Sequence, residues 1–146
     1  MPKELTYEDI EIGMELLPLV KETSSRMSAE WAGASGDYDP IHYDNEYARL
    51  RRFPSAIVNG RLKVAWLIQM MTNWIGDEGV LRKLGCQHRG VDIIGQPVKC
   101  KGRVTKKYVH DGEHLVECEI WTENPKGEKT APGEATVVLP SRTSRK

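Results

Sequence analysis

A long apolar segment at residues 60–76, G-R-L-K-V-A-W-L-I-Q-M-M-T-N-W-I-G, constrains the fold of this chain more than any other feature. Large side chains recur close to the helical period along one side, at Leu62, Trp66, Met70 and Trp74. Further apolar residues occupy the opposite side, and a helix of this kind should be buried on nearly every side. Its last residue is a glycine, which is typical of a helix C-terminus, so the sequence predicts a central helix that ends there.

After this helix the hydrophobic period changes to two. Four segments alternate apolar with polar residues over strand lengths, at 80–89, 98–109, 115–122 and 133–140. The connections H-D-G-E and E-N-P-K-G-E between the last three are typical hairpin turns. A first strand is expected at 14–22, where Pro18 restricts it to a sheet edge or a bulge. The pattern predicts an α+β domain in which a curved antiparallel sheet wraps around a long central helix.

Length and charge limit the classes of function. The 146 residues predict a single domain over 1–140 with a polar C-terminal tail at 141–146. Lys plus Arg and Asp plus Glu both number 21, and this zero net charge argues against nucleic acid or an anionic membrane as the main partner. No apolar run reaches the roughly 20 residues of a membrane span. The polar N-terminus lacks a targeting pattern and the three cysteines lack C-x-x-C spacing, so we expect reduced thiols and a cytoplasmic location.

Two short helices are predicted before the central one. Ser28 is placed to cap the segment A-E-W-A-G-A, and Asp44 is placed to cap N-E-Y-A-R-L. Between them lies a loop that cannot form a continuous helix, because Pro40 fixes its own φ and disfavours the α region for the residue before it.

This loop, S-G-D-Y-D-P-I-H-Y-D at residues 35–44, gathers several titratable groups. Asp37 and His42 flank the proline, and the bend between them is suited to turning both side chains toward one water molecule. Such a pair has the composition of a general acid and base. The alternative interpretation is an ordinary solvated turn, since D-x-D-P loops are also common turn sequences. We assign the other two aspartates to turn and cap roles.

The loop, followed by F-P-S-A-I-V-N-G ahead of the apolar helix, resembles the MaoC-like hydratases and dehydratases of the hot-dog fold. The resemblance extends from about the first strand to T-V-V-L-P. It implies that Asp37 is the catalytic aspartate and His42 the catalytic histidine. It also implies that the backbone N–H of Gly60, at the start of the helix, forms the oxyanion hole.

Two residues depart from the family pattern. Asn59 stands where the family commonly has the histidine of a His-Gly motif, and Arg61 replaces a usual apolar residue. Both are candidate substrate-binding residues, and Asn59 is alternatively the cap of the helix. The chain is most similar to a subgroup that comprises the small subunits of heteromeric enoyl-CoA hydratases acting on bulky steroid side-chain thioesters.

The resemblance implies an enoyl-CoA hydratase, or 3-hydroxyacyl-CoA dehydratase, that adds water across a trans-2-enoyl thioester. No cofactor or metal is expected, because CoA belongs to the substrate. The expected partner is a second copy or another MaoC-like chain. One alternative is a hot-dog acyl-CoA thioesterase, whose catalytic carboxylate usually lies on the central helix, where residues 61–75 have no Asp or Glu. Another is a non-catalytic subunit, which would be expected to lose Asp37 or His42.

The other histidines give no second site. His110 and His114 lie on either side of an Asp-Gly turn, where they do not have the helical spacing of a metal pair, and we expect both to be exposed. His88 is expected on a strand, where it is packed or faces solvent.

Overall fold

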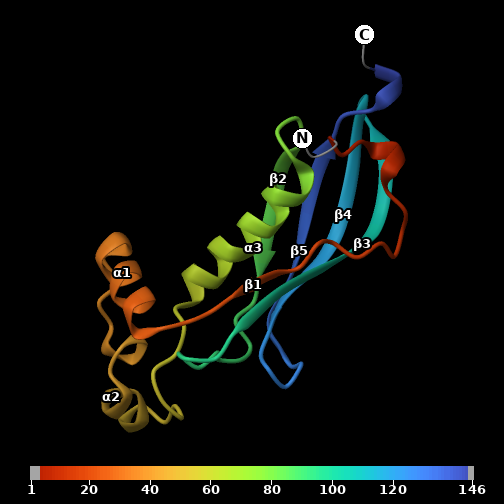
Figure 1. Cartoon of the computed structure of the whole chain (residues 1–146). Helices are drawn as coiled ribbons and strands as arrows, with labels where there is room; N and C mark the ends of the chain where they lie inside the picture. Colours follow the sequence, from red (N-terminus) through yellow and green to blue (C-terminus); the bar gives the residue numbers. More distant parts are fainter. Residues whose placement is uncertain (1–3, 145–146) are drawn as a thin grey trace.

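A five-stranded antiparallel sheet curls alongside helix α3 (Gly60–Ile75) in the computed structural model, which describes residues 4–144 (Figure 1). The strand order across the sheet is β1 (Leu19–Lys21), β3 (Val98–His110), β4 (Glu113–Glu123), β5 (Lys129–Leu139) and β2 (Val80–Cys86). All neighbouring strands are antiparallel. The predicted α+β fold, with a curved sheet around a long helix, is confirmed.

The core lies between α3 and the concave side of the sheet. Side chains two residues apart on β3, β4 and β5 share this face, because successive residues of a strand point to opposite sides. They include Val98, Cys100, Val104, Val116, Cys118, Ile120, Ala135, Val137 and Leu139. Burial raises the pKa of both cysteines in this set to about 12, so both remain protonated thiols.

Helix α3 has the predicted bounds but is less buried than its composition suggested. Gly76 ends the helix with φ at 74°, and its N–H donates to the Thr72 carbonyl at 3.2 Å. The expectation of burial on nearly every side is wrong, since the side of Ile68 is exposed. The reason is that the sheet covers only one face of the helix. The buried face carries one unexpected charged residue, Lys63.

The first strand is shorter than predicted, although its position at the sheet edge is confirmed. β1 begins directly after Pro18, and among residues 4–144 its one neighbouring strand is β3. Before the proline, contact with β3 continues through a bridge between Glu15 and Arg103 and through the Leu16 N–H, which donates to the Gly102 carbonyl at 2.9 Å.

Helices α1 (Ser25–Ser35) and α2 (Asn45–Leu50) lie near the end at which α3 begins (Figure 1). The cap predicted for α2 is confirmed, because Asp44 accepts a hydrogen bond from the Tyr47 N–H at 3.1 Å. The cap predicted for α1 is wrong. Ser24, in extended conformation, accepts from the Met27 N–H at 3.2 Å, and Ser28 is buried one turn inside the helix.

Near the two ends of the described chain, the short helices η1 (Tyr7–Asp9) and η3 (Arg142–Ser144) contact each other. Ser141, at the start of the predicted tail, is buried and hydrogen-bonded to Glu8, while residues 145–146 lie outside the part that the structure describes. Among residues 4–144, no helix combines the length and apolar character needed to cross a membrane.

Candidate active site

The backbone just before α3 is the base of the site. We call residues 56–59 the pre-helix segment; all four are buried. Its backbone pairs with the loop at 92–94: the Val58 N–H donates to the Asp92 carbonyl at 2.8 Å, and Ile57 bridges Ile93. These bonds fix the pre-helix segment against the rest of the domain.

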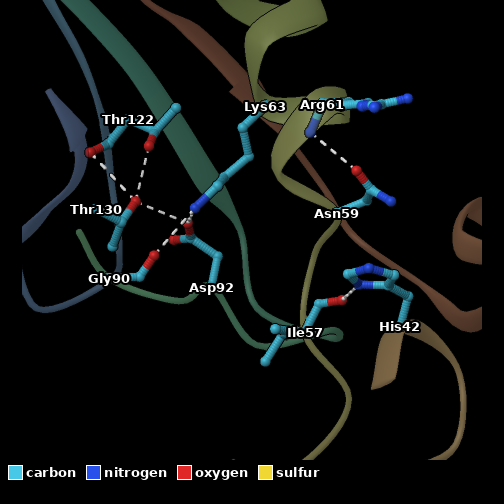
Figure 2. Close-up of polar contacts among 9 residues, drawn as sticks. All are labelled: His42, Ile57, Asn59, Arg61, Lys63, Gly90, Asp92, Thr122 and Thr130. Atoms are coloured by element: carbon cyan, nitrogen blue, oxygen red, sulfur yellow. Dashed lines mark hydrogen bonds and ion pairs between the residues drawn. The ribbon is translucent and has the colours of Figure 1, made fainter. Parts of the chain in front are cut away.

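His42 is held by this segment. Its ring lies on the short helix η2 (Pro40–His42), and Nδ1 is 2.9 Å from the Ile57 carbonyl oxygen (Figure 2). A carbonyl oxygen only accepts, so Nδ1 carries the hydrogen and donates. In the neutral ring, Nε2 is then the unprotonated nitrogen, which is the form that a general base requires.

Asp37 is held by the same segment through Asn59. It follows Gly36, whose φ of 77° ends α1. One carboxylate oxygen accepts from the Asp39 N–H at 3.2 Å, and the other accepts from Asn59 Nδ2 at 2.8 Å. The hydrogen bond from Asp39, and next the one from Asn59, lower the pKa of Asp37, with smaller contributions from the charges of His42 and Arg61. The carboxyl group is therefore ionised at neutral pH.

Asn59 connects this carboxylate to the central helix. Its side chain is buried, and its Oδ1 accepts from the Arg61 N–H at 2.8 Å (Figure 2). The interpretation of Asn59 as the helix cap is confirmed. The second role, as a donor to Asp37, was not predicted from the sequence, because the two residues are far apart along the chain.

Gly60 provides a backbone donor at the start of α3. The Asn59 carbonyl accepts from the N–H groups of Leu62 and Lys63, and the Asn59 side chain accepts from the Arg61 N–H. Within residues 4–144 the Gly60 N–H has no acceptor. Such first-turn donors, at the positive end of the helix dipole, are suited to an anion or a polarised carbonyl. The Arg61 side chain is exposed and extends away from the helix (Figure 2).

His88 packs against this glycine, which the sequence did not predict. A Cβ atom at Gly60 would lie 3.0 Å from Cε1 and Nε2 of the His88 ring. The expectation that His88 lies on a strand is wrong, because β2 ends at Cys86. Partial burial, and next the charge of Lys63, lower the pKa of His88. The Gln87 and Arg89 N–H groups still donate to the Pro132 and Thr130 carbonyls of β5, each at 2.9 Å, so the segment continues along β5 without the regular pairing of a strand.

The remaining histidines lie elsewhere. His110 is exposed, as expected, at the end of β3. His114 is on β4 and is half-buried, with its ring 4.9 Å from that of Tyr7, so the expectation of exposure is wrong for this residue. Among residues 4–144, no group of three His, Cys, Asp or Glu side chains is arranged to hold a metal ion.

A small hollow of about 250 Å³ adjoins the loop and is lined by Asp39, Ile41, Arg51 and Phe53. A larger one of about 810 Å³ lies over β2 and β5 and includes none of the site residues. Neither of these two hollows is lined by Asp37, His42, Asn59, Gly60 or Arg61.

Comparison with known proteins identifies the family. The chain matches the MaoC like domain over residues 9–124, most of its length. It belongs to the MaoC-like dehydratase family. A curated relative of this MaoC-like domain is the fatty acid synthase subunit beta of Saccharomyces cerevisiae, 26% identical over 113 residues, which are 77% of the chain but 5% of the relative.

Solved structures share the fold of this MaoC-like domain. The (R)-hydratase from A. caviae involved in PHA biosynthesis is 22% identical, with a TM-score of 0.80 over 91% of this chain and 99% of that one. R-hydratase PhaJ1 from Pseudomonas aeruginosa is 22% identical, with a TM-score of 0.83 over 95% and 88% of the two chains. The ChsH1–ChsH2 complex from Mycobacterium tuberculosis contains a chain 19% identical, with a TM-score of 0.76 over 88% and 98%. These likenesses show the hot-dog fold.

Proposed function

We propose that this MaoC-like domain is an enoyl-CoA hydratase that adds water across a trans-2-enoyl thioester, and catalyses the reverse dehydration. The observation that carries the proposal is that one buried segment holds both candidate catalytic side chains. Its Ile57 carbonyl orients His42, its Asn59 amide orients Asp37, and the helix that it leads into begins with the Gly60 N–H.

In the proposed reaction Asp37 and His42 share the attacking water. One takes a proton from it as the hydroxyl group adds to the β-carbon, and the other supplies the proton that the α-carbon gains. The base begins the reaction unprotonated, as the ionised Asp37 does and as Nε2 of His42 does in the neutral ring; the acid begins it protonated and regains its proton from the base afterwards. Negative charge that develops on the thioester oxygen is stabilised by the Gly60 N–H, and one such donor typically contributes on the order of 3 kcal/mol.

The departures from the family motif are assigned separate roles. Asn59 is a positioning residue, because its amide already binds Asp37 and the first turn of α3. Arg61 is the substrate-binding residue, since its exposed cation in the first turn of α3 suits a phosphate of the CoA carrier.

We further propose that the domain works in the cytoplasm as a homodimer or as a heteromer with another MaoC-like chain, on a bulky, steroid-like acyl group. The support is the sequence similarity to the small subunits of steroid side-chain hydratases and the two-chain ChsH1–ChsH2 neighbour. Strand β2 is at an edge of the sheet with β5 as its one neighbour in the described chain, which leaves its other side open for a partner's strand.

The test is a panel of trans-2-enoyl-CoA substrates with short, long and steroid-like acyl chains. The purified protein is assayed alone and with co-purified companion chains, following loss of the enoyl-thioester absorbance, the 3-hydroxyacyl product and free thiol. Hydration of any member supports the proposal. Release of free CoA without hydration would identify a thioesterase instead, and no turnover in either preparation would indicate a non-catalytic subunit.

A further inference from the structure

A buried ion pair lies directly beneath the start of α3. Lys63 is 2% exposed, and its ammonium group is 3.0 Å from a carboxylate oxygen of Asp92 and 3.2 Å from the Gly90 carbonyl oxygen (Figure 2). Both charged groups are therefore removed from solvent, and the resemblance to the family assigned no role to these residues.

The carboxylate end of the pair extends into the sheet. Asp92 is also 2% exposed, and the oxygen that contacts Lys63 accepts from the Thr130 hydroxyl at 2.7 Å. Thr130 in turn is 2.7 Å from the hydroxyl of Thr122 (Figure 2). The other Asp92 oxygen is buried without a hydrogen-bond partner among the described residues. Replacing buried ion pairs by apolar residues is often neutral or stabilising, so stability alone does not explain this network.

The position of this buried network relative to the proposed site does explain why it is present. Asp92 accepts the Val58 N–H with its backbone carbonyl while its side chain binds Lys63, so a single residue joins the pre-helix segment to α3. The pre-helix segment is the part of the chain that holds His42 and Asp37. A shift of the Asp92 loop therefore moves both side chains relative to the first turn of the helix.

We propose that Lys63 and Asp92 are positioning residues, a buried clamp that keeps Asp37 and His42 in register with the start of α3. The proposal rests on the hydration reaction proposed above. A clamp of this kind acts on the turnover step, because misplacing catalytic groups by about 1 Å costs on the order of 10²-fold in rate.

The test compares an apolar replacement of the clamp with the loss of an ion pair elsewhere. The clamp variant is Lys63→Met/Asp92→Leu, which leaves no unpaired buried charge. The control is Arg26→Gln/Glu30→Gln, which removes a pair 2.8 Å apart between exposed side chains of α1. If the clamp variant does not fold, Thr130→Val, which is nearly isosteric and removes the donor to Asp92, takes its place.

Two readouts separate this proposal from the proposed function. We expect the clamp variant to lose about 10²-fold in kcat with KM nearly unchanged, and the control to retain wild-type kinetics. We also expect the Val58 amide to exchange hydrogen at least about 10-fold faster, while the Val116 amide in the central strand β4 is unchanged.

A folded clamp variant with wild-type kcat would overturn the proposal. If the wild-type protein hydrates none of the substrates, the proposed function fails, and amide exchange then decides on the clamp alone. Unchanged exchange at Val58 would overturn it, and selective acceleration at Val58 would support it.

Discussion

Replacement of Asn59 by alanine tests the link between the helix cap and the proposed catalytic carboxylate. The substitution removes two hydrogen bonds at once, the 2.8 Å bond from the Arg61 N–H and the 2.8 Å bond to Asp37. The bond from the Arg61 N–H contributes to stability, and the bond to Asp37 contributes to catalysis in the proposed mechanism. The two effects are therefore measured separately.

The stability cost follows from the cap. Loss of a side-chain N-cap typically costs about 1 kcal/mol, and up to about 2 kcal/mol when the cap is buried as Asn59 is. The bond to Asp37 adds little to this sum, because that carboxylate is partly exposed and screened by solvent. For a chain of this length 1 kcal/mol corresponds to roughly 2–4 °C, so the expected decrease in Tm is about 2–8 °C.

The expected loss of activity is larger than this loss of stability would cause. Without the amide, Asp37 is no longer oriented, and kcat should fall about 10²-fold. Asn59→Asp separates the two contributions, because its carboxylate still caps α3 but repels Asp37. It should keep a Tm near that of the wild type, raise the pKa of Asp37 and lose activity as severely as Asn59→Ala.

The matched control is Ser24→Ala, which removes the cap of α1, a 3.2 Å bond from the Met27 N–H. Its Tm should fall by a similar amount while kcat is unchanged. Thermal unfolding by circular dichroism measures Tm, and steady-state hydration of an accepted enoyl-CoA measures kcat. If Asn59→Ala keeps wild-type kcat, or if Ser24→Ala loses as much activity as Asn59→Ala, the role assigned to Asn59 is refuted.

Two further predictions concern neighbouring atoms. Gly60→Ala should be neutral or destabilising in the wild-type background, where the new Cβ meets the His88 ring at 3.0 Å, but should raise stability by up to about 1 kcal/mol in a His88→Ala background. Equal effects on Tm in both backgrounds would contradict the contact. The pKa of Asp37 is lowered on folding, so its ionisation stabilises the fold above the unfolded pKa, and this contribution is lost as pH falls through the folded pKa. In kcat/KM profiles the limb due to Asp37 should lie below pH 3.8 in the wild type and at higher pH in Asn59→Ala, and an unmoved limb would contradict this.

The elements that were predicted correctly are those whose signals are local. The helical period at 60–76 and the period of two after it depend only on neighbouring residues, and the helix and the four strands after it formed within a few residues of their expected bounds. The Asp37-to-His42 spacing also lies within one loop, and the catalytic role of the two residues stays a prediction. The assignment of Ser28 as the cap of α1 failed because Ser24 and Ser28 both precede helix-forming residues, and only the extended backbone at Ser24 distinguishes them.

The contacts that could not be predicted join residues far apart along the chain. Lys63 is charged yet lies on the buried face of α3, because Asp92 and Thr130 are brought beneath it by the sheet. The Asn59 amide and the Asp37 carboxylate are likewise far apart along the chain and meet only in the folded domain. One signal was available for Lys63: a charged residue next to Leu62, on the apolar side of the helix, indicates a buried partner.

The most direct test of the proposed active site is the hydration of one accepted trans-2-enoyl-CoA by the wild type, Asp37→Asn, His42→Ala and the double variant, each shown to be folded by circular dichroism. General acid–base groups typically contribute 10²–10⁴-fold, so kcat should fall by about that factor in each single variant. The double variant should be hardly worse than either, since the two groups act on one water. Single variants that hydrate the substrate at the wild-type rate would contradict the assignment of Asp37 and His42.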